Sequence, residues 1–137
     1  MVMNSTVHIC WKKAAAYMDI EPRFTTCGTD RYTINPQDAV SLVDENTILV
    51  CAILGSSYTG EYDDVAELNE LLLEKNSQMH LSVGIHVDAA SGGFVAPFTC
   101  PEVSWDFRLP LVNSINVSGH KCAYLILKSS PPSAAND

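Results

Sequence analysis

The sequence predicts an α/β fold in which helices cover a mostly parallel sheet. Residues 47–54, T-I-L-V-C-A-I-L, form a continuous apolar and β-branched run, which is typical of a strand buried on both faces. Shorter apolar runs at residues 85–88 and 112–117 alternate along the chain with segments of helical periodicity. Strands that alternate with helices indicate parallel pairing through right-handed crossovers.

Three segments are expected to form the flanking helices. Residues 7–18 place apolar side chains at mostly helical spacing. Asn35 and Pro36 make a strong helix start, an N-cap followed by proline at the first helical position, and this helix should run to about Asp44. Asp63 is expected to cap the third helix, whose apolar stripe consists of Val65, Leu68, Leu71 and Leu72.

The remaining segments are predicted as short strands, loops and a tail. Further strands are expected at residues 24–27 and 122–127. A loop is expected at residues 55–60, a polar linker at residues 76–84 and irregular chain at residues 92–110. Residues 128–137 are polar and broken by prolines, so we expect them to be disordered. The chain is thus predicted to contain part of one domain, residues 1–127, and this tail.

Composition narrows the classes of function. Of the 137 residues, 47% are hydrophobic and 18% are charged, against the roughly 25% charged residues of an average globular domain. So short and apolar a chain indicates a piece of a larger protein, or one that oligomerises. The net charge of -8 argues against binding to nucleic acid. No apolar run approaches the roughly 18 residues that a membrane span requires.

The cysteines and the N-terminus indicate a cytoplasmic protein. The five cysteines form no CxxC pair and no Cys/His zinc spacing. The first residues, M-V-M-N-S-T, show no basic region followed by an apolar one, so no signal peptide is visible. We therefore expect reduced thiols in the cytosol.

The predicted topology indicates where a ligand would bind, independently of any sequence motif. Ligand sites of open α/β sheets lie beyond the carboxyl ends of the strands, where the loops that hold Ser57 and Lys121 and the loop after Asp88 should meet. Apolar sequence brackets Lys121 on both sides, and desolvation there would free its amine to form a Schiff base with a carbonyl. Asp88 ends an apolar strand, so its carboxylate should be buried and needs a partner, unless it caps a helix or loop.

An amine and a carboxylate at two strand ends are what pyridoxal phosphate requires. The amine holds the aldehyde of the cofactor, and the carboxylate keeps the pyridine nitrogen protonated so that the ring can accept electrons. The pair formed by Lys121 and Asp88 therefore predicts a pyridoxal-phosphate site.

Several motifs carry a resemblance to a known family. The three longest are I-H-V-D-A-A-S-G-G-F at residues 85–94, W-D-F-R-L-P at residues 105–110 and S-I-N-V-S-G-H-K at residues 114–121. Two more, V-D-E-N-T-I at residues 43–48 and L-G-S-S-Y-T-G at residues 54–60, precede them in the expected order. From about residue 7 to residue 121 the sequence resembles glutamate decarboxylases, which are group II pyridoxal-phosphate-dependent decarboxylases. This resemblance implies a partial large domain of fold type I, the aspartate aminotransferase fold.

The resemblance also implies roles for individual residues. Lys121 matches the lysine that binds the cofactor aldehyde, and Asp88 the acid that pairs with the pyridine nitrogen. Ala90 matches the small residue on one face of the ring, and His8 stands where the family usually has glutamine on the other face. The remaining matches are Ser118 and His120 near the phosphate and Ser57 near the cofactor and substrate. His86 shares a strand face with Asp88, so it either orients that carboxylate or is a satisfied core histidine.

The implied reaction is decarboxylation of L-glutamate to 4-aminobutanoate and carbon dioxide, in a full-length protein that forms a homo-oligomer. The family's enzymes are several times longer, and their phosphate-cupping segment and small C-terminal domain have no match in this sequence. Directly after Lys121 the sequence departs from the family's pattern of an aromatic residue and a glycine. We therefore expect a truncated chain that alone binds the cofactor weakly and has little or no activity.

Two other classes of function remain open. The first is a non-catalytic fragment that associates with full-length subunits through exposed apolar surface. The second is a metal-dependent hydrolase with His86, Asp88 and His120 as ligands, because an H-x-D pair on one strand face is plausible ligand spacing.

Overall fold

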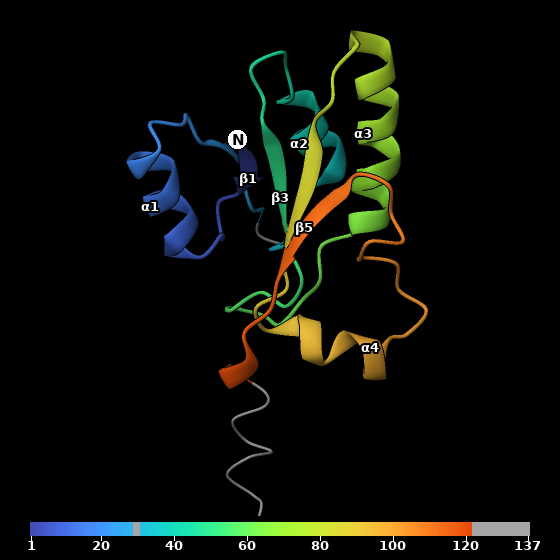
Figure 1. Ribbon diagram of the computed structural model, residues 1–137. Helices are drawn as coiled ribbons and strands as arrows, with labels where there is room; N and C mark the ends of the chain where they lie inside the picture. The colour runs from blue at the N-terminus through green and yellow to red at the C-terminus, as the bar shows by residue number, and fades with distance from the viewer. Residues whose placement is uncertain (29–30, 122–137) are drawn as a thin grey trace, which may run out of the picture.

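The computed structural model describes residues 1–28 and 31–121. Within these residues five strands form one all-parallel sheet in the order β2-β1-β3-β4-β5 (Figure 1). In chain order the strands are β1 (Val2–Asn4), β2 (Arg23–Thr25), β3 (Leu49–Ile53), β4 (Gly84–Asp88) and β5 (Val112–Asn116). The predicted parallel α/β fold is confirmed.

Helices cover both faces of this sheet. On one face lies α1 (Ile9–Tyr17), and on the other lie α2 (Pro36–Ser41) and α3 (Val65–Met79) (Figure 1). A short 3-10 helix, η1 (Gly92–Phe94), and α4 (Ala96–Thr99) follow the carboxyl end of β4. The chain moves from β1 to β2 on one side and then crosses to β3 on the other side of β1. The direction of winding therefore reverses between β1 and β3, which is where open α/β sheets bind ligands.

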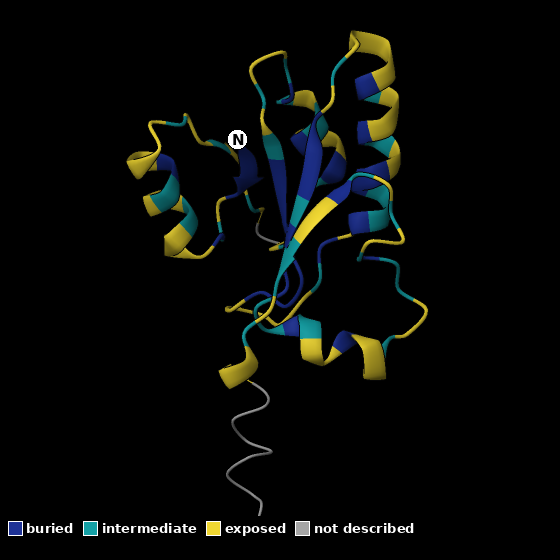
Figure 2. Ribbon diagram, in the orientation of Figure 1, coloured by how far each residue is buried: buried dark blue, intermediate teal, exposed yellow. Residues whose placement is uncertain are grey.

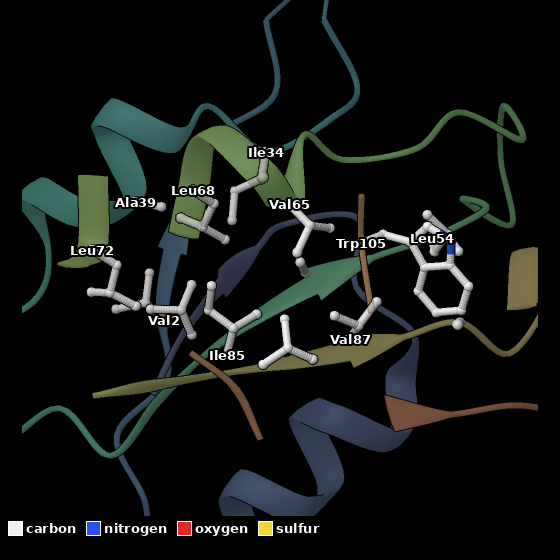
Figure 3. Close-up of a cluster of buried hydrophobic side chains, with 14 of the residues drawn as sticks. Val2, Ile34, Ala39, Leu54, Val65, Leu68, Leu72, Ile85, Val87 and Trp105 are labelled. Carbon is white, nitrogen blue, oxygen red and sulfur yellow. The ribbon is translucent and has the colours of Figure 1, made fainter. Parts of the chain in front are cut away.

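Two apolar cores hold the helices on the sheet. The larger one fills the space between the sheet and the α2 and α3 helices and includes Val2, Leu68, Leu72, Ile85, Val87 and Trp105 (Figure 3). The smaller one lies under α1 and includes Met3, Val7, Ala15, Cys51 and Ile53. Figure 2 shows the central strands as largely buried. Burial on both faces explains why β3 has a continuous apolar sequence instead of an alternating one.

The predicted start of α2 is confirmed, whereas the predicted cap of α3 is off by one residue. Asn35 Oδ1 accepts hydrogen bonds from the backbone N–H groups of Gln37 at 3.1 Å and Asp38 at 3.4 Å. Asp64 caps α3, because its Oδ1 accepts from Glu67 N at 2.9 Å.

Asp63, which the sequence suggested as that cap, is buried between β3 and the segment before α2. Its two carboxylate oxygens accept from Ile34 N at 2.8 Å and Ile53 N at 2.6 Å. Burial raises the pKa of Asp63 to about 6, although the two backbone donors favour its charged form.

Three further predictions of secondary structure need correction. β1 was not predicted, although its three residues are buried; all three pair with β2, and Val2 and Met3 also pair with β3. The expected linker at residues 76–84 instead contains the last turn of α3, which ends at Met79 and is followed by the left-handed C-cap His80. The expected irregular chain at residues 92–110 contains η1 and α4. The strand predicted at residues 122–127 and the tail lie outside the described residues.

Candidate active site

An open pocket of roughly 320 Å³ lies at the carboxyl edge of the sheet, beside the point where the winding reverses. Its walls come from the segments that follow β1, β3, β4 and β5 and from the start of α1. Seven of the eight residues that the sequence predicted for the site line it: His8, Ser57, Asp88, Ala90, Ser118, His120 and Lys121. The eighth, His86, lies outside the lining. Segments that are far apart in sequence thus meet where strand topology predicted.

Three hydrogen bonds fix the carboxylate of Asp88 in this pocket, hereafter the anchored carboxylate. Asp88 ends β4 and is only 8% exposed. Asn116 Nδ2 and Ala90 N donate to its Oδ1 at 2.9 and 3.2 Å. Trp11 Nε1 donates to its Oδ2 at 2.8 Å. Donors on both oxygens fix the plane of the carboxylate, as burial of such a group requires.

His86 does not contact Asp88 directly. Its Nε2 lies 2.8 Å from Asn116 Oδ1, and its Nδ1 lies 2.7 Å from Ser114 Oγ. Its ring packs against the indole of Trp11, with 4.6 Å between the ring centroids. The imidazole is therefore connected to Asp88 through Asn116.

Lys121 reaches the pocket from the turn that follows β5. Ser118 N donates to Ala90 O at 3.3 Å, which ties this turn to the end of β4, and Lys121 N donates to Ser118 O at 3.1 Å. Gly119 starts a helical turn, and nothing lies within 4 Å of its Cβ position. Lys121 is exposed. This exposure does not fit the expected desolvation, but that expectation also rested on apolar residues 124–127, which lie outside the described residues, so it stays a prediction.

Backbone packs directly on backbone beneath the pocket. Gly55 has a φ of 92°, and Gly92 N donates to Leu54 O at 2.9 Å. A Cβ atom on Gly92 would lie 2.5 Å from that carbonyl oxygen. The absence of a side chain at Gly92 therefore lets the segment after β4 lie directly against the backbone that follows β3.

Near the α1 side of the pocket, His8 serves as the N-cap of α1. Its Nδ1 accepts from Cys10 N at 3.3 Å.

Cys51 on β3 is buried. Burial first and the charge of Asp88 second raise the pKa of its thiol well above the usual value. The cysteines of the described residues are free: Cys10, Cys27, Cys51 and Cys100.

Sequence reasoning missed Trp11 and Asn116, the two side chains that hold Asp88. A signal for Asn116 was present, because it stands four residues into a strand expected to neighbour that of Asp88. Trp11 offered none, since a tryptophan in an apolar helical pattern is expected to be core.

Across residues 1–28 and 31–121, no three His, Cys, Asp or Glu side chains are grouped where they could hold a metal ion. In the same residues no helix has the length and apolar character needed to cross a membrane.

The fold and the pocket define a class, the α/β domains that bind a cofactor at the carboxyl edge of a parallel sheet. The chain belongs to the pyridoxal-dependent decarboxylase family: the profile described as "Pyridoxal-dependent decarboxylase conserved domain" matches residues 1–130. The resemblance to this family is thereby confirmed.

Individual relatives agree with this assignment. Glutamate decarboxylase 5 of Arabidopsis thaliana is 54% identical over 121 residues, which are 88% of this chain and 24% of that protein. Glutamate decarboxylase beta of Listeria innocua is 50% identical over 121 residues, 88% of this chain and 26% of that protein. The solved structure of Lactobacillus brevis glutamate decarboxylase superposes with a TM-score of 0.85 and 43% identity, covering 88% of this chain and 27% of that one. The chain thus spans about a quarter of the length of these relatives.

The pocket suits the cofactor that the family name implies. An anchored carboxylate fits a protonated ring nitrogen, and an exposed amine on the same pocket fits an aldehyde. The methyl side chain of Ala90 leaves room for a flat ring, and hydroxyl and imidazole groups at Ser118 and His120 fit a phosphate.

Proposed function

We propose that this chain supplies the cofactor-binding part of a glutamate decarboxylase, which converts L-glutamate to 4-aminobutanoate and carbon dioxide. The observation that carries the proposal is that Asp88, at the end of β4, and Lys121, in the turn after β5, line the same pocket. The similarity to glutamate decarboxylases of plants and bacteria supports glutamate as the substrate.

Each residue of the pocket has a proposed task. Lys121 would hold pyridoxal phosphate through its aldehyde, and Asp88 would pair with the ring nitrogen. When bound, the cofactor supplies an electron sink for the pair left behind as the α-carboxylate departs. The side chains proposed to lie against the two ring faces are Ala90 and His8. Ser118 and His120 would donate hydrogen bonds to phosphate oxygens, and Ser57 would donate from the β3 side.

Trapping the covalent link tests this proposal. The 137-residue chain is incubated with pyridoxal phosphate, reduced with borohydride, digested and analysed by mass spectrometry. The adduct is expected on Lys121 and should be absent from Lys121→Ala. The matched control is Lys75→Ala on α3, which should retain the adduct because Lys75 is remote from the pocket lining. An adduct that survives Lys121→Ala, or none in the wild type, contradicts the assignment.

Turnover by this chain alone is a separate question. Because the chain spans about a quarter of its relatives, we expect little or no release of carbon dioxide from labelled L-glutamate by the purified chain. Turnover comparable to that of a longer relative would overturn this expectation.

Three exposed aromatic side chains support the second candidate, a fragment that associates with full-length subunits. Phe94, Phe98 and Phe107 are exposed, Phe98 to 83%, on the segment that contains η1 and α4. Contiguous exposed apolar patches mark interaction sites, and these side chains are candidates to contribute to one. Size-exclusion chromatography with and without a full-length glutamate decarboxylase would detect such association, and unchanged elution would argue against it.

A further inference from the structure

A chain of hydrogen bonds leads from the surface of β5 to the anchored carboxylate. Ser114 and Asn116 lie on β5, and His86 and Asp88 lie opposite them on β4. Ser114 contacts the imidazole at 2.7 Å, the imidazole contacts Asn116 at 2.8 Å, and Asn116 contacts Asp88 at 2.9 Å. The three contacts form an unbroken line beside the pocket.

An irregularity in the sheet creates this alignment. Ile85 pairs with Val112 and His86 pairs with Ser114, so Asn113 is skipped at a bulge. In a regular ladder Asn113 would stand opposite His86, and every later residue of β5 would turn its side chain to the other face. The bulge therefore brings Ser114 and Asn116 onto the face that His86 and Asp88 share.

The direction of each hydrogen bond follows from chemistry. The carboxylate of Asp88 can only accept, so the amide of Asn116 presents its Nδ2 there and turns its Oδ1 toward His86. That oxygen can also only accept, so Nε2 of His86 carries a proton. Nδ1 faces the hydroxyl of Ser114, which can donate or accept.

Trp11 completes the arrangement from the α1 side. Its indole N–H holds Oδ2 of Asp88 at 2.8 Å while its ring packs on His86. Rotation of the carboxylate would break the bond to Trp11 or to Asn116, and rotation of the Asn116 amide would place its Nδ2 against the Nε2–H of His86.

We propose that His86 and Asn116 are positioning residues, which hold the Asp88 carboxylate in the one orientation that can accept from a protonated ring nitrogen. His86 acts at a distance, through Asn116, and touches neither cofactor nor substrate. This inference rests on the proposed function, in which Asp88 meets the pyridine ring.

Two variants of His86 separate positioning from packing. His86→Phe keeps a flat ring against Trp11 but removes both nitrogens. His86→Gln retains an N–H donor for Asn116 and an acceptor for Ser114. Each is titrated with pyridoxal phosphate and with its carbocyclic analogue, in which C–H replaces the ring nitrogen. We expect His86→Phe to bind pyridoxal phosphate about tenfold more weakly, the equivalent of one well-formed hydrogen bond, and to bind the analogue as the wild type does. His86→Gln should resemble the wild type with both ligands.

Equal weakening of both ligands by His86→Phe would show a merely structural role and overturn the proposal, as would unchanged binding of both. Failure of the proposed function gives a different result, because the wild type would then yield no borohydride-trapped adduct on Lys121.

A second measurement needs no cofactor. In NMR spectra of the uniformly labelled chain, the side-chain amide protons of Asn116 should exchange slowly in the wild type and in His86→Gln, and about tenfold faster in His86→Phe. Equally slow exchange in His86→Phe would overturn the positioning role of His86 even if the Lys121 adduct forms.

Discussion

The indole N–H of Trp11 donates to Oδ2 of Asp88 at 2.8 Å, across 77 positions of the sequence. This bond joins α1, which covers one face of the sheet, to the carboxyl end of β4. It is one of three that orient the carboxylate, and the other two come from β5 and from the loop after β4. The helix on that face thus contributes to the pocket as well as to the core.

Trp11→Phe should lower the free energy of unfolding by about 1–3 kcal/mol, because the aromatic packing on His86 remains but a buried carboxylate oxygen loses its donor. Urea unfolding followed by circular dichroism measures the change. Tyr17→Phe on the same helix, at a side chain that is 85% exposed, should have no effect. Equal stability of Trp11→Phe and wild type would show that the bond is not made in solution.

Asp88→Asn should weaken binding of pyridoxal phosphate by about tenfold or more, because the amide is neutral and cannot accept from Trp11 and Asn116 on both of its atoms. Absorbance titration of the cofactor reports the change. Asp38→Asn, an exposed change in the first turn of α2, is the control and should bind normally. Undiminished binding by Asp88→Asn would remove this carboxylate from the site.

Asp63 should make the chain less stable as the pH rises from about 4 to about 6. Burial raises the folded-state pKa of Asp63 to about 6 from an ordinary value of 3.8. As the pH rises, the unfolded chain therefore loses this proton before the folded chain does. The contribution of Asp63 to the free energy of unfolding is complete below about pH 4 and is lost as the pH rises through about 6, a decrease of roughly 3 kcal/mol.

The measurement for Asp63 is the free energy of unfolding in urea at several pH values, with Asp63→Asn beside the exposed cap variant Asp64→Asn. The difference between wild type and Asp63→Asn should change across this pH range, whereas Asp64→Asn should run parallel to the wild type. A constant difference between wild type and Asp63→Asn would contradict the raised pKa.

Gly92→Ala should destabilise the chain by about 1–3 kcal/mol or more, because the new methyl group would lie 2.5 Å from Leu54 O in a backbone-to-backbone contact that cannot relax by side-chain rotation. Gly119→Ala provides the comparison, since nothing lies within 4 Å of its Cβ position. Thermal unfolding of both variants measures the contrast. Equal midpoints for the two would show that the loops after β3 and β4 do not pack so closely.

Local sequence was a good guide where one pattern dominates. The β3 run, the Asn35–Pro36 helix start and the apolar stripe of α3 each rest on residues that are adjacent or one helical turn apart. Prediction failed where neighbouring signals compete. Asp63 and Asp64 are equally good caps by type, and only the burial of Asp63 against Ile34 and Ile53 assigns the cap to Asp64. β1 was missed because three residues are too short a pattern to recognise without the strands on either side.

At the site, strand order alone predicts that the segments after Asp88 and before Lys121 meet, because parallel strands bring their carboxyl ends to one edge of the sheet. The motifs added the family and the cofactor. The way in which Asp88 is held, in contrast, follows from tertiary packing. Its partners Trp11 and Asn116 depend on the docking of α1 and on a bulge that skips Asn113. A bulge moves side chains from one face of a sheet to the other, so no spacing within a single strand could reveal which residues of β5 face His86 and Asp88.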